Sequence, residues 1–433
     1  MLFSNTIELI NIYIGDDLVM QHIIEEAKRC LQCKNAQCRK GCPVNTPINE
    51  AINMLLNGKI SEAGEKLFLN NPLSVVCALV CPHEKFCEGN CVLAHKGNPI
   101  HWSSIEYYIS NYYLNKINMK SNIDSNKKIA IIGSGPAGIT IAFILASRGY
   151  DITIFELRDK IGGVLRYGIP NFRLPNEILD RLEEKLINIG VKIRPNTLIG
   201  PVITIDDIFR DGYKAIFIGT GVWNPKPLRI KGESLGHVHY AIDYLKNPDV
   251  YDLGKKVCII GAGNVAMDVA RTVLRKDVNE VHIMYRRGEE DMPASRHEIE
   301  YAKLEGVQFE FYKMPIELND KGVKYLETKK VNEDGEEKLV TIENSEAIFE
   351  SDSIIIAASQ GPKANIISYT KGIEINQFGL VRTDEYGRTT REGVFASGDV
   401  VTGAKTVVEA VRFSKKVADT IDQYVQDKYY KKY

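Results

Sequence analysis

Eight of the nine cysteines in the chain lie between residues 30 and 91, and this clustering constrains the fold more than any other feature. The first group has the spacing Cys-x2-Cys-x4-Cys-x3-Cys-Pro, and the second has Cys-x3-Cys-Pro followed by Cys-x3-Cys. Disulfides persist in oxidising compartments, and Met1 to Glu8 lack a basic segment followed by an apolar one that would direct export. The sequence therefore predicts that these cysteines are metal or cluster ligands.

Short spacings of this kind let one loop surround an iron–sulfur cubane. A final Cys-Pro after three residues is typical of ferredoxin-like sequences in which that thiolate binds a second cluster. Eight cysteines suffice for two [4Fe–4S] clusters. A structural zinc module is the alternative, because Cys30-x2-Cys33 alone suits zinc equally well. The two Cys-Pro groups favour clusters, and the nearby His83, His95 and His101 are expected to be solvated rather than to be ligands.

The composition excludes several classes of protein. The 55 basic and 56 acidic residues give a net charge of −1, so no overall field draws the chain to nucleic acid or to a lipid surface. No apolar run approaches the roughly 18 residues that cross a bilayer. The 433 residues allow about three domains. An intracellular, cytoplasmic protein is expected.

Apolar periodicity divides the chain into a helical part and an α/β part. Helices are expected over 21–31, 48–56, 61–69 and 105–114, among the cysteines. The polar stretch 120–128 is interpreted as a linker. From residue 128 the pattern is strand, glycine turn, helix and strand, and it recurs from residue 257. Two such units predict two Rossmann-like dinucleotide-binding domains after an α-helical iron–sulfur domain. The tail from Tyr424 to Tyr433 is expected to fray.

The first glycine turn, Gly-x-Gly-x-x-Gly, follows the apolar segment 129–132 and precedes a helical pattern over 137–148. Its glycines permit the turn, the approach of a pyrophosphate and the packing of helix on strand. A carboxylate ends the next strand, where it can accept a hydrogen bond from a ribose hydroxyl. The loop 162–175 can lie against a large flat ligand. The predicted contacts are Gly133, Gly135, Pro136, Ala137, Gly138, Glu156, Gly163 and Arg173.

The second turn, residues 261–266, has alanine in place of the third glycine. Its next strand, 281–285, ends in Arg286-Arg287 rather than in an acid. A cationic pair there suits a 2′-phosphate and favours NADP over NAD, although a solvated basic turn is the alternative. Asp268 could complement the dipole of the helix after the turn. The predicted nucleotide contacts are Gly261, Gly263, Asn264, Val265, Arg286 and Arg287.

Two absences narrow the chemistry. No Cys-x-x-Cys occurs after residue 91, so a redox disulfide like that of thioredoxin reductase is not expected. The segment His297-Glu298-Ile299-Glu300-Tyr301 lacks the second histidine of a zinc protease. Cys258 lies within a predicted buried strand and is expected to be an inert apolar residue.

With its two cysteine groups and two glycine motifs, the second followed by Arg-Arg, the chain resembles the small (β) subunit of glutamate synthase. Related arrangements are the N-terminal half of dihydropyrimidine dehydrogenase and the large subunit of NADH-dependent ferredoxin:NADP oxidoreductase. The similarity runs from about Glu26 to Val425. Its most specific stretches are residues 30–43, 77–91, 162–175 and 285–287, Met292-Pro293-Ala294, and Ser397-Gly398-Asp399.

The resemblance implies a glutathione-reductase-like arrangement with FAD on the first motif and NADPH on the second. Residues 1–120 would form the cluster domain, 121–228 with 361–433 the FAD domain, and 229–360 an inserted NADPH domain. Gly398 and Asp399 would approach the flavin ribityl chain and pyrophosphate. Thr406 and Val407 would lie at a helix N-terminus near the isoalloxazine ring.

The resemblance also implies which side chains hold the clusters. In such proteins the cysteine at the position of Cys77 is not a ligand, and a carboxylate in the following helix takes its place. One cluster would then be bound by Cys30, Cys33, Cys38 and Cys91, and the other by Cys42, Cys81, Cys87 and Glu106.

Nicotinamide gives up two electrons together, whereas [4Fe–4S] clusters carry one at a time, and flavin can do both. The predicted path is NADPH to FAD to the clusters to an electron-accepting or catalytic partner protein. A glutamate-synthase-like input subunit is the leading hypothesis. The alternatives are a dihydropyrimidine dehydrogenase input subunit, a subunit of an electron-bifurcating transhydrogenase, and a non-catalytic scaffold with bound zinc.

Overall fold

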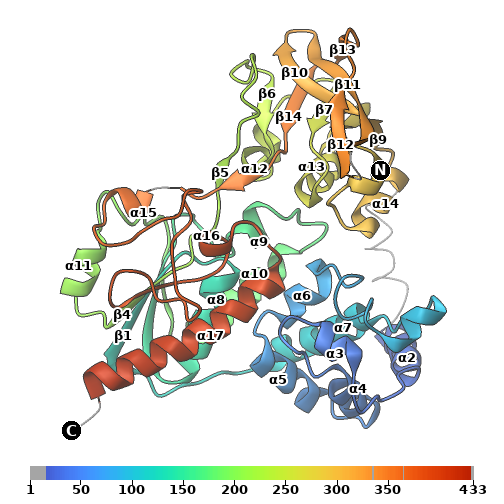
Figure 1. Cartoon of the computed structure of the whole chain (residues 1–433). Helices are drawn as coiled ribbons and strands as arrows, with labels where there is room; N and C mark the ends of the chain where they lie inside the picture. Colours follow the sequence, from blue (N-terminus) through green and yellow to red (C-terminus); the bar gives the residue numbers. More distant parts are fainter. Residues whose placement is uncertain (1–15, 334–335, 364, 431–433) are drawn as a thin grey trace.

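The computed structural model describes residues 16–333, 336–363 and 365–430, so Met1 to Glu8 and the last three residues of the tail lie outside the described part. The chain forms three regions: a helical region, a first parallel sheet with its helices, and a second parallel sheet with an antiparallel extension (Figure 1). No helix among the described residues is long and apolar enough to span a bilayer.

The helical region holds eight of the cysteines and packs around α7 (Trp102–Lys116). Trp102, Ile105 and Ile109 of α7 are at most 2% exposed and form a core with apolar side chains of α4 and α5. The structure therefore confirms the four expected helices, with bounds shifted by a few residues except in α4. The other helices are α2 (Asp16–Lys28), α3 (Gln37–Gly41), α4 (Ile48–Leu56), α5 (Ile60–Asn70), α6 (Ser74–Val80) and the 3₁₀ turn η1 (Val92–Lys96).

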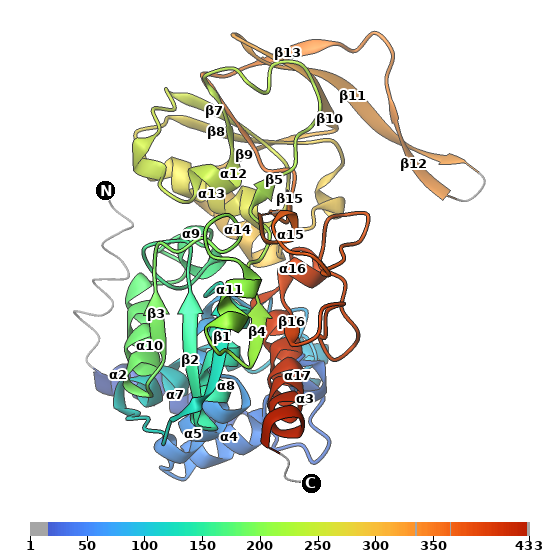
Figure 2. The same cartoon turned by 90° about the vertical axis from the view of Figure 1, so that its left-hand side faces the viewer.

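The first sheet has five parallel strands in the order β16-β4-β1-β2-β3. Continuous apolar strands such as β4, which is buried along its whole length, are typical of a parallel sheet covered on both faces. Helices α8 and α17 pack together beside it (Figure 2). Its elements are β1 (Asp124–Ile132), α8 (Pro136–Ser147), β2 (Tyr150–Phe155), α9 (Val164–Tyr167), α10 (Asn176–Asn188), β3 (Lys192–Arg194), α11 (Ile205–Arg210), β4 (Ala215–Ile218), α15 (Asn365–Ser368), β16 (Val394–Ala396), α16 (Asp399–Thr402) and α17 (Val407–Val425).

The second sheet is also parallel, in the order β6-β14-β7-β8-β9. An antiparallel sheet of β10 to β13 extends from it, and β11 with β12 projects as a long hairpin (Figure 2). The elements are β6 (Val238–Tyr240), α12 (Ala241–Tyr244), η2 (Pro248–Val250), β7 (Lys256–Ile260), α13 (Asn264–Leu274), β8 (Glu280–Tyr285), η3 (Glu289–Asp291), α14 (Arg296–Leu304), β9 (Gln308–Phe311), β10 (Lys313–Asn319), β11 (Gly322–Glu333), β12 (Glu336–Thr341), β13 (Ala347–Glu350) and β14 (Ser353–Ile356).

The chain crosses between the two sheets twice, and the two crossing segments lie side by side. Strand β5 (Asn224–Pro225) leads out of the first sheet, and β15 (Gln360–Gly361) leads back. The two pair as an antiparallel ribbon. The second sheet is therefore held to the first by two adjacent segments.

Three expectations need correction. The stretch 120–128 is not only a linker, because β1 begins at Asp124 and pairs there with Tyr150. The tail does not fray as far as Tyr430, because a π-helical turn, η4 (Gln426–Tyr430), continues α17 and the Tyr430 hydroxyl donates to the Asn126 carbonyl over 2.9 Å. His83 is not solvated; it is 9% exposed, and burial lowers its pKa.

Candidate functional site

The first glycine turn forms a cradle between β1 and α8. Gly133 has a φ of +95°, which glycine adopts readily, and a Cβ there would lie 2.7 Å from the Gly219 carbonyl oxygen. Gly135 is the N-cap of α8, and a Cβ on it would meet nothing closer than 4.0 Å. That open space lies over the N–H groups of a helix N-terminus, where a pyrophosphate is stabilised. The cradle thus fits the dinucleotide that the motif predicts.

Glu156 directly follows β2 and stabilises the first glycine turn. Its Oε2 accepts hydrogen bonds from the backbone N–H of Ser134, over 2.9 Å, and from the Ser134 hydroxyl. Its Oε1 accepts from the Arg158 N–H over 2.8 Å. Each carboxylate oxygen has two lone pairs. The carboxylate therefore orders the turn and still lines the cavity where a ribose hydroxyl could reach it.

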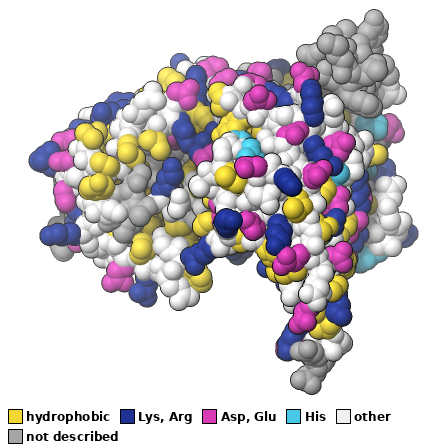
Figure 3. Space-filling model, turned by 90° about the horizontal axis from the view of Figure 1, so that it is seen from above, with side chains coloured by type: hydrophobic (Ala, Val, Ile, Leu, Met, Phe, Trp, Pro, Cys, Tyr) yellow, Lys and Arg dark blue, Asp and Glu magenta, His cyan; other side chains and the backbone are white. Residues whose placement is uncertain are grey.

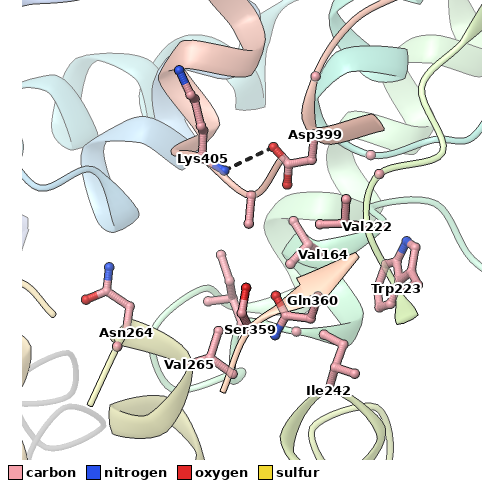
Figure 4. A pocket seen from close by; sticks show the side chains of 18 of the residues that line it. Val164, Val222, Trp223, Ile242, Asn264, Val265, Ser359, Gln360, Asp399 and Lys405 are labelled. Atoms are coloured by element: carbon pink, nitrogen blue, oxygen red, sulfur yellow. Dashed lines mark hydrogen bonds between the residues drawn. The ribbon is translucent and has the colours of Figure 1, made fainter. Parts of the chain in front are cut away.

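The C-terminal part of the chain closes the opposite side of the cradle. Gly398 precedes α16, and Asp399 Oδ1 accepts from the Lys405 N–H over 3.2 Å (Figure 4). Burial raises the pKa of Asp399 to about 6. Thr406 is the N-cap of α17 and forms a capping box with Glu409. Thr406 and Val407 therefore lie at the N-terminus of α17, where the resemblance places them.

The second glycine turn repeats this geometry in the other sheet. Gly261 has a φ of +129°, and a Cβ there would lie 2.5 Å from the Ala357 carbonyl oxygen. Gly263 is the N-cap of α13, with nothing within 4 Å of where its Cβ would be. Asn264 Oδ1 accepts from the Ser295 N–H over 2.9 Å, and Asn264 lies beside Val265 at the cavity wall (Figure 4). This turn also fits a dinucleotide.

Arg286 and Arg287 follow β8 and are both exposed. Arg286 lines the cavity, whereas Arg287 is not part of its lining. Within the described ranges, neither guanidinium forms an ion pair or a side-chain hydrogen bond. Both are thus free to bind an anion.

Arg173, predicted to contact the cofactor, lines the cavity and also bridges the two sheets. It extends from the loop before α10, is 12% exposed, and donates from Nη1 to both carboxylate oxygens of Asp268. Its Nη2 lies 2.7 Å from Glu298 Oε1. Asp268 therefore does more than complement the dipole of α13, because its carboxylate is buried against a cation from the other sheet.

One cavity of about 1270 Å³ joins both glycine turns. Its walls also include Val80, Pro82, Lys85 and Phe86 from the helical region, on either side of Cys81. The two dinucleotide cradles thus open onto one volume, and residues adjacent to Cys81 in sequence form part of its wall.

Five of the cysteines predicted as ligands line a separate small cavity of about 30 Å³: Cys30, Cys33, Cys38, Cys87 and Cys91. Burial, followed by the neighbouring cysteines, raises the pKa of Cys38 to about 11. Cys87 thus borders this cavity, although the resemblance assigns it to the other cluster.

A second set of cysteines lies near the carboxyl of Glu106, which is 4% exposed: Cys42, Cys77, Cys81 and Cys87. Burial and then the nearby Cys77 raise the pKa of Glu106 well above its ordinary value. Glu106 in turn is among the charges that raise the pKa of Cys42 and Cys87, after burial. The side chains of Cys77 and Cys81 are hydrogen-bonded to each other, and Cys77 Sγ also accepts from Asn71 Nδ2 over 3.2 Å.

The arrangement of the cysteine thiols and the Glu106 carboxyl fits an iron–sulfur cluster better than a single metal ion. Among the residues that the structure describes, no three His, Cys, Asp or Glu side chains converge as the ligands of a single metal ion would. The protein ligands of a cubane bind different irons, so they surround a volume rather than a point. Buried thiols and a buried carboxyl with raised pKa values need positive partners to ionise, which cluster irons provide.

Sequence reasoning missed part of the cavity wall. The segment Gly219-Thr220-Gly221 and Trp223 line the cavity after β4, and the Arg158 guanidinium lies 5.6 Å from the Trp223 ring. The signal was available, because an apolar strand followed by Gly-Thr-Gly has the form of the other two nucleotide turns.

Comparison with known proteins agrees with this geometry. The pyridine nucleotide-disulphide oxidoreductase family matches residues 127–413, and the dihydropyrimidine dehydrogenase domain II, 4Fe–4S cluster family matches residues 13–117. The glutamate synthase [NADPH] small chain of Escherichia coli is 32% identical over 93% of this chain and 91% of its own length. The NAD-dependent dihydropyrimidine dehydrogenase subunit PreT of Salmonella typhimurium is 30% identical over 93% and 94%.

Among solved structures, Mycobacterium tuberculosis FprA in complex with NADPH superposes with a TM-score of 0.59. It is 17% identical, and the match covers 70% of this chain and 85% of that one. This likeness shows the fold: two dinucleotide-binding sheets of the pyridine-nucleotide oxidoreductase type.

Fold and site together define an NAD(P)H-dependent flavin oxidoreductase to which a 4Fe–4S region has been added. Within that class, the chain belongs to the glutamate synthase small-chain family. Cys258, which alone among the cysteines lies in the oxidoreductase part, is fully buried in β7.

Proposed function

We propose that the chain is the electron-input subunit of a larger enzyme, taking electrons from NADPH through one FAD and two [4Fe–4S] clusters to a partner protein. The observation that carries this proposal is the common cavity. It is lined by both glycine turns and by Pro82 and Phe86, which lie between Cys81 and Cys87 in sequence. A single volume of about 1270 Å³ allows a flavin and a nicotinamide to meet beside a cluster.

FAD would lie on the first cradle. Gly135 would leave room for its pyrophosphate, Glu156 would accept from its ribose, and the α17 N-terminus would face its ring system. When bound, flavin accepts an electron pair from nicotinamide and gives single electrons to clusters. Gly133, Pro136, Ala137, Gly138, Gly163, Gly398, Asp399, Thr406 and Val407 complete the proposed contacts.

NADPH would lie on the second cradle, on Gly261, Gly263, Asn264 and Val265. Its 2′-phosphate would bind Arg286, which lines the cavity and has a free guanidinium. Guanidinium groups form strong charge-assisted bonds with phosphate. We also propose that the domain limits are 1–120, 121–228 with 361–433, and 229–360.

The proposed clusters have separate ligand sets. Cys30, Cys33, Cys38 and Cys91 would bind the cluster at the small cavity. Cys42, Cys81, Cys87 and Glu106 would bind the other. Because Pro82, the residue after Cys81, lines the common cavity, this second ligand set would be the nearer of the two to a flavin bound there.

A protein partner is part of the proposal, because the relatives described above are a small chain and a subunit. The partner would supply the site for the final substrate. No nucleic acid is proposed, since basic and acidic side chains are interspersed over the face seen in Figure 3. Free thiols as cluster ligands suit a reducing compartment, so we propose the cytoplasm. A dihydropyrimidine dehydrogenase input subunit is the second candidate, supported by the PreT match.

The experiment is an assay of the isolated, reconstituted chain. We expect it to reduce artificial dyes with NADPH but to form no product from glutamine with 2-oxoglutarate, or from uracil-type pyrimidines. Turnover of either substrate without a partner would overturn the input-subunit proposal, and failure to reduce dyes would overturn the electron path.

A further inference from the structure

Three consecutive acids follow the arginine pair in the loop after β8. Glu289, Glu290 and Asp291 form η3, only two to four residues beyond Arg287. A 2′-phosphate bound at the arginines would carry negative charge close to three carboxylates. Like charges this close oppose binding, so the loop needs compensation that its own sequence does not contain.

The structure supplies that compensation from elsewhere in the chain. Glu289 pairs with Lys303 of α14, over 2.6 Å. The Nζ of Lys330 lies 2.8 Å from Glu290 Oε1 and 2.9 Å from Asp291 Oδ2. Every acid of the loop thus has a cation, while the two arginines are left unpaired in the part of the chain that the structure covers.

Lys330 belongs to β11, in the hairpin that projects from the second sheet (Figure 2). The same strand fixes the loop backbone, because the Thr328 hydroxyl donates to the Arg286 carbonyl over 2.7 Å. Tyr312 adds two contacts: its N–H donates to the Arg287 carbonyl over 3.2 Å, and its hydroxyl donates to Glu290 over 3.1 Å. The hairpin base thus packs directly on the arginine loop.

Glu290 is a permanent charge. The hydrogen bond from Lys330 lowers the pKa of Glu290 to about 2, so the carboxylate stays ionised at any physiological pH. Without Lys330, Glu290 and Asp291 would lose their ion-pair partner beside the proposed phosphate position. Lys330 is 25% exposed and placed between both.

We propose that Lys330 is a positioning and specificity residue for 2′-phosphorylated nucleotides, because it places a cation between the two carboxylates beside Arg286 and so reduces their negative charge. This inference rests on the proposed NADPH site. The hairpin therefore contributes to the choice between NADPH and NADH although its residues do not line the nucleotide turn.

The experiment compares Lys330→Met with Lys324→Met in the full, cofactor-loaded chain. Lys324 lies on the same strand and pairs with Glu346, away from the loop, and is the matched control. Binding of 2′,5′-ADP and of 5′-AMP is measured by calorimetry, and Michaelis constants for NADPH and NADH by dye reduction. For Lys330→Met we expect 2′,5′-ADP to bind roughly three- to tenfold more weakly, with 5′-AMP unchanged.

Two further variants separate charge from structure. Lys330→Arg should keep the affinity for 2′,5′-ADP, and the double variant Lys330→Met with Glu290→Gln should recover part of it. Equal losses for 2′,5′-ADP and 5′-AMP, or no recovery in the double variant, would overturn the proposal. If Arg286→Ala lowers the affinity for 2′,5′-ADP while Lys330→Met does not, the proposed NADPH site is supported and the proposed role of Lys330 is wrong. If neither variant lowers this affinity, the proposed NADPH site itself is wrong.

Discussion

The Nη1 of Arg173 donates to both carboxylate oxygens of Asp268, at 2.8 and 2.9 Å, and so joins a loop of the first sheet to helix α13 of the second. The pair is buried, with Arg173 12% and Asp268 5% exposed. Glu298 of α14 shares the same guanidinium and passes the network on to Arg271. The two nucleotide cradles are thus fixed relative to each other by charge as well as by the β5–β15 ribbon.

Replacing Arg173 with methionine should destabilise the protein by about 3–5 kcal/mol, because it leaves the buried Asp268 without its cation. Chemical denaturation followed by circular dichroism measures this change in the free energy of unfolding. Arg382→Met, which breaks an exposed pair with Glu374, should cost at most about 1 kcal/mol. Similar small effects in both variants would show that the Arg173 pair is not structurally important.

The stability should also fall as pH rises through the titration of Asp268. Burial raises the pKa of Asp268 to about 6, above its value in the unfolded chain, so the folded state binds the proton more tightly. The contribution of this proton to the free energy of unfolding is at most about 3 kcal/mol. It is fully present below about pH 4 and is lost between about pH 4 and pH 6. Asp268→Asn should flatten that part of the curve of unfolding free energy against pH. An unchanged curve in the variant would contradict the shift.

Gly135→Val should abolish FAD binding, because the added side chain would fill the open space over the N-terminus of α8. Gly263→Val is the matched variant in the second cradle, where the space is equally open. It should retain FAD and lose NADPH. Flavin absorbance after gel filtration, together with NADPH titration, measures both outcomes. Stoichiometric FAD in Gly135→Val would refute the first assignment.

Iron and sulfide counts should distinguish Glu106 from Cys77. Glu106→Ala should lose or weaken one of the two clusters, whereas Cys77→Ala should leave both, since the Cys77 side chain already bonds to Asn71 and Cys81. The counts are made anaerobically on reconstituted protein, with about eight irons expected for two cubanes. The reverse pattern would make Cys77 the ligand.

Arg286 should contribute more than Arg287 to the preference for NADPH, because the Arg286 side chain lines the cavity. Each charge-assisted bond to the 2′-phosphate is worth roughly 1.5–3 kcal/mol before screening. Arg286→Ala should therefore raise the Michaelis constant for NADPH and leave that for NADH nearly unchanged. Equal losses with both nucleotides would assign the pair a different role.

The sequence predicted those parts of the molecule that depend on local patterns. Apolar periodicity located α4 without error, and the glycine turns with their flanking strands located both cradles, because each motif is continuous in the chain. The spacing also indicated that the cysteines of the helical region form a cluster-binding pattern, since Cys-Pro groups can be recognised in the sequence alone. The start of β1 was missed because Asp124 pairs with Tyr150 without any apolar alternation nearby.

The ion pairs and the burial that could not be predicted depend on contacts between residues far apart in sequence. The bridging contacts of Arg173 could not be predicted, because nothing near it in the sequence reveals that Asp268 and Glu298 lie opposite. The pairing of Glu290 with Lys330 could not be predicted either, since the two residues lie on separate elements, η3 and β11, that are far apart in sequence. His83 was expected in solvent because its neighbours are polar, yet the fold buries it.

The ribbon of β5 and β15 has a consequence for modular redesign. Because the chain leaves and re-enters the first sheet at Asn224–Pro225 and Gln360–Gly361, the two ends of the intervening segment lie side by side. Segments whose ends are adjacent can be exchanged between proteins without moving the scaffold that carries them. The whole nucleotide-specificity element could thus be grafted as a cassette, provided that the acceptor offers a partner for Asp268.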